Sequence, residues 1–238
     1  MAGRKPEFGS GSLFRAAGNV YGVMMGDALL VLANVLVVLM PLLIGVLGPV
    51  ALLGFVLVGP SVVASCYAFN RLLAGADRGV FRDFLTSYRL NFKQALLVSL
   101  PYMLFLGAIA FNLSVLPGSL DAGSLGSGAQ VAARIGLVGL ALLVCTAAMN
   151  AMLLLSRFSF RTRDIYRLSV YTVGAQKRVS LGTAGILFVS AFVLGLTTVW
   201  LVLFIAGPVL YLVCLNSRPL LATVEDKFTV AAMPNGAN

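Results

Sequence analysis

The stretch GVFRDFLTSYRLNFKQALLVSLPYMLF, residues 79–105, decides which class of protein the chain belongs to. Its first half mixes charged residues with large aromatic ones, whereas its second half is almost entirely apolar. Of the 238 residues, 60% are hydrophobic and 11% are charged, whereas about 25% of a soluble domain is charged. The apolar runs are continuous rather than alternating, which argues against an outer-membrane barrel. The sequence therefore predicts an all-α, polytopic transmembrane helical bundle.

Five apolar blocks define the predicted spans, because an apolar helix of about 20 residues crosses a bilayer. They cover residues 28–47, 50–69, 95–116, 135–155 and 179–215. The last block exceeds one membrane thickness, and Trp200 near its middle favours a position at the membrane surface. We therefore expect an outer turn at 195–198 and six spans. A five-span arrangement, with one tilted helix and a re-entrant tail, stays open.

The distribution of basic residues predicts an orientation. The connections 70–94 and 156–178 are rich in arginine and lysine, whereas the connection 117–134 has only Arg134, at its end. The positive-inside rule then places both basic connections and the N-terminus in the cytoplasm. We expect one transmembrane domain, which comprises a cytoplasmic arm with an interfacial helix (1–26), a membrane bundle (28–223) and a tail (224–238).

Two basic segments have the pattern of amphipathic helices that lie on the membrane surface. The first is 79–93, after which we expect the chain to turn into the membrane at about Gln94. The second is 163–178, and residues 12–24 are a third candidate. Such strips either anchor the protein to anionic lipid or form a cytoplasmic docking face for another protein. The predicted docking residues are Phe81, Arg82, Asp83, Leu85, Tyr88, Arg89, Phe92, Lys93, Arg163, Arg167, Lys177 and Arg178.

Several kinds of chemistry are missing from the sequence. It has no histidine, which excludes Ser–His triads and histidine metal sites, and no phosphate-binding P-loop. We place no carboxylate inside a predicted span, since Asp27 opens the first, although coupled carriers usually need one. Asn34 and Asn150 are expected to hydrogen-bond between helices. We therefore predict a protein that is not an enzyme and needs no cofactor or metal. The positive-inside bias explains the net charge of +9 without nucleic acid.

Two segments of the chain resemble each other. VGPSVVASCYAFNRLLA (58–74) aligns without gaps with AGPVLYLVCLNSRPLLA (206–222), so that Gly-Pro, Cys and Leu-Leu-Ala coincide. Proline inside a helix removes a hydrogen bond and kinks it, and broken helices in matching positions can mark a transporter's binding site. We therefore regard the two Gly-Pro pairs, Gly59-Pro60 and Gly207-Pro208, as candidate kinks of a small-molecule permease.

The sequence from Gly59 to Leu100 resembles the YesL family of bacterial membrane proteins. The matching pieces are Gly59-Pro60, Arg71, VFRDF (80–84) and NFKQALL (91–97), and the opening SLFRAAGNVYGVMMGDALLVLANVL (12–36) resembles the start of the family. The resemblance extends over residues 12–105 and is only general beyond. It implies a multi-pass protein of the bacterial inner membrane, associated with carbohydrate uptake alongside sugar ABC importers.

The leading hypothesis is therefore a non-enzymatic accessory protein of a carbohydrate-uptake system. Its expected partners are membrane lipids and an ABC transporter subunit or other membrane protein, but not nucleic acid. The alternative is a small-molecule permease with its site at the Gly-Pro pairs. An enzyme acting on a lipid-linked substrate is a third hypothesis, which the lack of histidine and of intramembrane acids disfavours.

Overall fold

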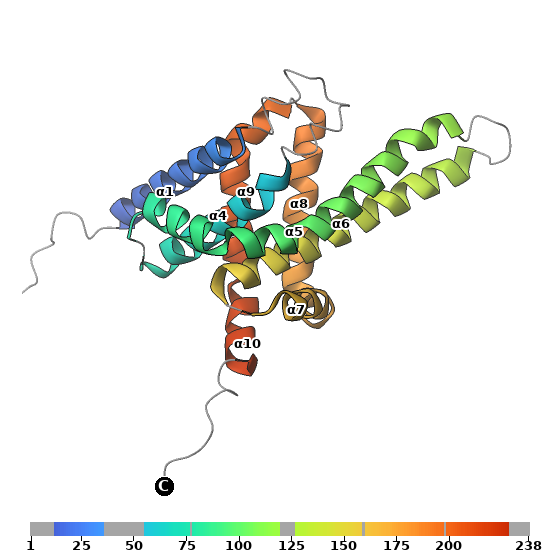
Figure 1. Ribbon diagram of the computed structural model, residues 1–238. Helices are drawn as coiled ribbons and strands as arrows, with labels where there is room; N and C mark the ends of the chain where they lie inside the picture. Colours follow the sequence, from blue (N-terminus) through green and yellow to red (C-terminus); the bar gives the residue numbers. More distant parts are fainter. Residues whose placement is uncertain are drawn as a thin grey trace, which may run out of the picture.

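The computed structural model describes residues 12–35, 55–76, 78–119, 127–158, 160–197 and 199–228, which form helices and their connections without a strand (Figure 1). The all-α prediction is confirmed for these residues. The α-helices are α1 (Ser12–Ala33), α4 (Val58–Ala74), α5 (Val80–Ser119), α6 (Ser127–Arg157), α7 (Thr162–Ala175), α8 (Lys177–Leu196), α9 (Val202–Asn216) and α10 (Arg218–Phe228). The 3-10 turns η1 (Phe55–Leu57) and η2 (Val199–Leu201) precede α4 and α9.

Five of these helices are long and apolar enough to cross a membrane, namely α1, α4 with η1, α5, α6 and α8. The pair α9 and α10, bent by 44° at their junction, brings the number to six if it counts as one span. The prediction of five or six spans agrees with this. The turn expected at 195–198 also agrees, because α8 ends at Leu196 and η2 begins at Val199.

Two predicted domain boundaries fall within helices. The expected interfacial helix 12–24 and the start of the first span form one helix, α1, which crosses the expected boundary between arm and bundle. Residues 36–54, where the first predicted span ends and the second begins, lie outside the described residues. At the other end, α10 continues to Phe228, past the predicted start of the tail at 224.

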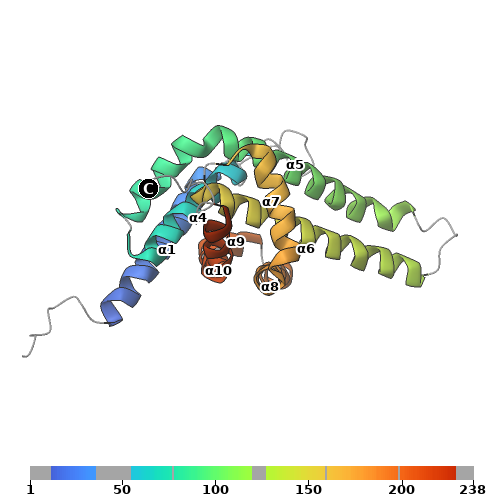
Figure 2. The same cartoon turned by 90° about the horizontal axis from the view of Figure 1, so that it is seen from below.

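The predicted turn at Gln94 is wrong, because α5 is one helix from Val80 to Ser119. Its charged first half packs into the bundle, since Val80 and Phe84 are buried with Leu29 of α1 and Ala64 of α4. Figure 2 shows that α5 bends along its length without a break. Pro101 lies within this helix, and its missing N–H and its ring permit such a bend.

The core is centred on α4, whose residues from Gly59 to Cys66 are all buried. Side chains of α1, α5, α6, α7 and α9 complete it. Beyond the core, α5 and α6 project together as a long hairpin (Figure 1). Apolar side chains on its outer part, such as Leu104, Phe111 and Ile135, are exposed. Exposed apolar surface of this kind is what a lipid-facing helix presents.

The basic ends of several helices meet on one side of the bundle. Arg218, at the start of α10, donates to the carbonyl of Leu73 at the end of α4. Arg157, at the end of α6, pairs with Glu225 of α10 at 2.9 Å. These contacts fit the alternation of basic and bare connections. The assignment of this side to the cytoplasm stays a prediction.

Candidate functional site

An aromatic ladder follows one face of the first half of α5. The rings of Phe84 and Tyr88 stack with centroids 5.8 Å apart, and those of Tyr88 and Phe92 lie 5.4 Å apart. Phe84 is buried, whereas Tyr88 and Phe92 are half-buried. Of the other predicted aromatic and apolar docking residues, Leu85 is half-buried and Phe81 is exposed. Of the predicted docking residues, only Tyr88 and Phe92 belong to the ladder, whose inner member is Phe84.

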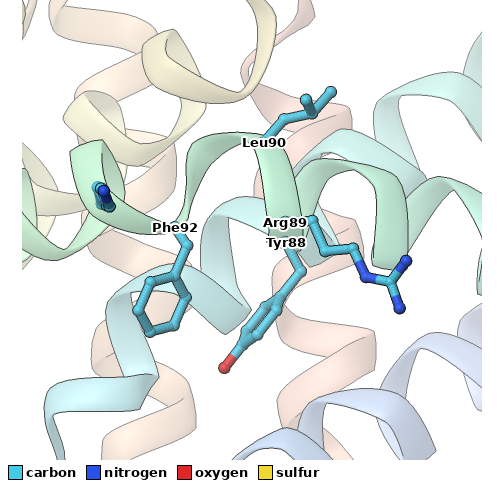
Figure 3. A pocket seen from close by; sticks show the side chains of 5 residues that line it. Tyr88, Arg89, Leu90 and Phe92 are labelled. Carbon is cyan, nitrogen blue, oxygen red and sulfur yellow. The ribbon is translucent and has the colours of Figure 1, made fainter.

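A stripe of cations runs beside the ladder. Arg82, Arg89 and Lys93 are exposed and, at spacings of seven and four residues, share one face of α5. An open hollow of about 460 Å³ is lined by Tyr88, Arg89, Leu90, Phe92 and Lys93. In Figure 3, Tyr88 and Phe92 point to the same side of the helix, Arg89 extends beside Tyr88, and Leu90 points to the opposite side. The hollow therefore combines aromatic surface with positive charge.

Asp83 does not belong to this exposed surface, which corrects its prediction as a docking residue. Its buried carboxylate lies 3.2 Å from Nε of Arg71 and accepts a hydrogen bond from the backbone N–H of Arg78 at 3.2 Å. Arg71 also donates to the carbonyl of Ala76 at 2.5 Å. The turn between α4 and α5 needs positive φ at Gly79, where φ is 99°. Asp83 and Arg71 thus hold this turn together.

The second predicted strip is divided between two helices. In α7, Ile165, Ser169 and Thr172 face the interior, whereas Arg163 and Arg167 are exposed. Lys177 and Arg178 are also exposed but belong to the first turn of α8. Within the described residues, none of these four cations forms an ion pair with a carboxylate. They are a second set of exposed cations, on helices other than α5.

Polar contacts join α7 to the middle of α5. The hydroxyl of Tyr166 donates to the carbonyls of Leu97 at 2.7 Å and Val98 at 3.2 Å. In an α-helix the carbonyl of Leu97 would accept from the N–H of residue 101, but residue 101 is proline and has none. Burial raises the pKa of Tyr166 above its ordinary value, and nearby Tyr102 adds to this. Tyr166 therefore replaces the missing donor and stays protonated.

Further hydrogen bonds extend this joint. The hydroxyls of Tyr102 and Ser169 are 2.8 Å apart, and Gln94 Nε2 donates to the carbonyl of Phe160, just before α7, at 2.6 Å. The sequence interpretation missed the joint. A proline inside a long apolar helix was the available signal, since its freed carbonyl needs a donor from elsewhere.

The two predicted asparagines do connect helices. Asn34 Nδ2 donates to Ser61 Oγ of α4 at 2.6 Å, and Asn150 Nδ2 of α6 lies 3.5 Å from Thr172 Oγ1 of α7. Asn216 of α9 adds a further link, from its Nδ2 to Thr183 Oγ1 of α8 at 3.1 Å. Hydrogen bonds between helices are thus confirmed for both predicted positions.

Asp27 lies inside a helix rather than at its start, which corrects the statement that no acid lies within a span. It belongs to the part of α1 that is apolar enough to cross a membrane, and it is only 8% exposed. Its Oδ1 accepts a hydrogen bond from the backbone N–H of Gly207 in α9 at 2.5 Å. The predicted first span starts at residue 28, sixteen residues after the start of α1 at Ser12. That late start leaves Asp27 outside the predicted span.

The two Gly-Pro pairs differ in their positions within their helices. Pro60 is the third residue of α4, in the first turn, where proline is tolerated. It therefore marks no kink inside a helix, which corrects the prediction. Pro208 lies inside α9 and is exposed. No described hollow is lined by either pair.

The similar segments nevertheless pack against each other. Cys214 Sγ lies 3.9 Å from the carbonyl of Cys66, the residue it aligns with. Both glycines allow close helix approach, as is typical of membrane bundles. A Cβ on Gly59 would lie 2.1 Å from Ser99 Oγ, and one on Gly207 would lie 2.5 Å from Asp27 Cβ.

The comparison with protein families matches part of the chain. A family model described as a protein of unknown function, DUF624, matches residues 29–113. DUF624 is the YesL-type family, so the match agrees with the resemblance over the first part of the chain, from the end of α1 through most of α5. No curated protein and no solved structure matches the chain.

Proposed function

We propose that the protein is a non-enzymatic component of the bacterial inner membrane that docks a partner protein at the basic end of its bundle. The observation that carries the proposal is the exposure of Arg163 and Arg167 on α7 and of Lys177 and Arg178 on α8. An exposed charged patch steers and selects a partner of opposite charge. With the N-terminus in the cytoplasm, this patch faces the cytoplasm.

The way in which α7 is held supports a docking role. Its inner face is fixed to α5 by the hydroxyl of Tyr166 and by the contact between Tyr102 and Ser169. The outward cations are therefore presented on a helix that is already in place, which lowers the entropic cost of binding. The resemblance to the YesL family directs the proposal to carbohydrate uptake, with an ABC transporter subunit as the partner.

Co-purification in mild detergent tests this proposal. The tagged protein should recover a transporter subunit, and the reciprocal purification should recover the protein. Arg163→Gln combined with Arg167→Gln should weaken the recovery at least several-fold. Arg134→Gln, which removes an exposed cation near the far end of the α5–α6 hairpin, should leave it unchanged. Equal recovery with all variants, or no recovered protein at all, would contradict the proposal.

One observation favours the permease as a second candidate. Buried carboxylates inside spans are typical of coupled carriers, and Asp27 is such a group, in contact with α9 one residue before Pro208. Uptake into vesicles that contain only this protein separates the two candidates. Uptake that Asp27→Asn abolishes would support the permease, whereas an accessory protein alone should move nothing.

A further inference from the structure

The cation stripe of α5 continues into a row of exposed leucines on the same face of the helix. Leu97, Leu100 and Leu104 follow Lys93 at intervals of four, three and four residues, so they lie in line with Arg89 and Lys93. Their exposed fractions are 61%, 44% and 66%. One helical face thus changes from positive charge to apolar surface within a single turn.

This face has the dimensions of one membrane leaflet. At a rise of 1.5 Å per residue, the eleven steps from Lys93 to Leu104 cover about 16.5 Å, and half of the hydrocarbon core is about 15 Å thick. A molecule with an anionic head at Arg89 and Lys93 and with chains along the leucines would match the face from end to end. A membrane lipid combines these two parts at this length.

The charges in the hollow favour an anionic head group. Arg89 and Lys93 are four residues apart, so their charges repel each other on the helix. Among the described residues neither has a carboxylate partner, because Asp83, the acid nearest in sequence, is bound to Arg71. Tyr88 lines the same hollow, and a phosphate group can accept hydrogen bonds from the side chains of Arg, Lys and Tyr.

From these observations we propose that the hollow on α5 binds an anionic phospholipid. Arg89, Lys93 and Tyr88 hold its phosphate, and its acyl chains lie along Leu97, Leu100 and Leu104. The inference goes beyond the proposed function and does not depend on it, since the protein partner is assigned to the cations of α7 and α8. A lipid bound here would fix the depth of α5 in the membrane.

Native mass spectrometry of the delipidated protein tests the inference, with phosphatidylglycerol and phosphatidylcholine of identical acyl chains as probes. We expect tighter binding of phosphatidylglycerol. Each cation near an anionic head group is worth a factor of about five in affinity, so Arg89→Gln with Lys93→Gln should weaken binding by about twenty-five-fold. The matched control, Arg134→Gln with Arg161→Gln, also removes two exposed cations and should retain the wild-type affinity.

Three results would overturn the inference. The first is equal binding of the two lipids. The second is a loss of binding in the control variant as large as that in the Arg89→Gln, Lys93→Gln variant. The third is displacement of the lipid by soluble glycerol 3-phosphate, which would reveal a site for free phosphate. Arg89→Lys keeps the charge and should retain most of the affinity, so a loss of binding there would also contradict a charge-based site. Co-purification of a partner protein is measured separately, so that failure of one proposal leaves the other intact.

Discussion

We predict that the hydroxyl of Tyr166 stabilises the protein because it donates to a carbonyl that Pro101 leaves without a donor in α5. Removal of the hydroxyl tests this prediction. Tyr166→Phe keeps the ring, whose centroid lies 5.7 Å from that of Tyr102, so packing is preserved. What is lost is the donor to the carbonyls of Leu97 and Val98, at 2.7 and 3.2 Å. The carbonyl of Leu97 then has no donor in its own helix, because residue 101 is proline.

The size of the effect follows from the surroundings. An acceptor left without a partner costs about 1–3 kcal/mol away from water, whereas side-chain hydrogen bonds between membrane helices average about 0.6 kcal/mol and reach about 1.7. We therefore expect Tyr166→Phe to lower the free energy of unfolding by about 1–1.5 kcal/mol. Pro101→Ala restores an N–H that can donate to the carbonyl of Leu97. In that background the same substitution should cost less than about 0.5 kcal/mol.

The assay is equilibrium unfolding in mixed detergent micelles, followed by far-ultraviolet circular dichroism, for the four members of the double-mutant cycle. Tyr171→Phe on the same helix, where the side chain is 59% exposed, serves as the control and should change stability little. An equal cost of Tyr166→Phe with and without Pro101 would refute the reasoning, because the hydroxyl would then act through some other contact.

Three further predictions concern packing, charge and orientation. Gly207→Ala should destabilise the protein by about 1–3 kcal/mol, because the added Cβ would lie 2.5 Å from a side chain of α1. The control is Gly185→Ala, which has open space around it and should be neutral or slightly stabilising in the same unfolding assay. Asp83→Asn should cost about 1–2 kcal/mol, because the carboxylate is buried but its arginine partner is 27% exposed. Arg89→Cys and Arg167→Cys should resist an impermeant maleimide added outside intact cells, and labelling of either would reverse the predicted orientation.

The sequence is a good guide to the spans because their signal is local. An apolar run of sufficient length predicts a membrane helix without knowledge of its neighbours, and the turn after Leu196 could be located from the length of the last apolar block and the position of Trp200. The exposure of Arg89 and Lys93 was predictable for the same reason. Cations beside an apolar run stay at the surface unless a partner neutralises them.

The errors concern residues whose roles depend on contacts between helices. Asp83 has the pattern of a surface acid, but Arg71, at the end of another helix, binds it. The turn expected at Gln94 rested on the change from charged to apolar residues. However, Phe84 already packs against α1 and α4, and this packing keeps the charged half of α5 in the bundle. Periodicity reveals that a face exists but not what covers it.

The placement of Asp27 changes how the two candidate functions compare. The sequence places no acid inside a predicted span, which disfavours the permease, and the position of Asp27 in α1 removes that objection. However, the carboxylate accepts the N–H of Gly207 at 2.5 Å, and Asp27 is only 8% exposed. A coupling site must exchange with water at some stage of transport. In the described arrangement Asp27 instead joins α1 to α9, as expected for a structural contact, so a transport role would require these two helices to separate.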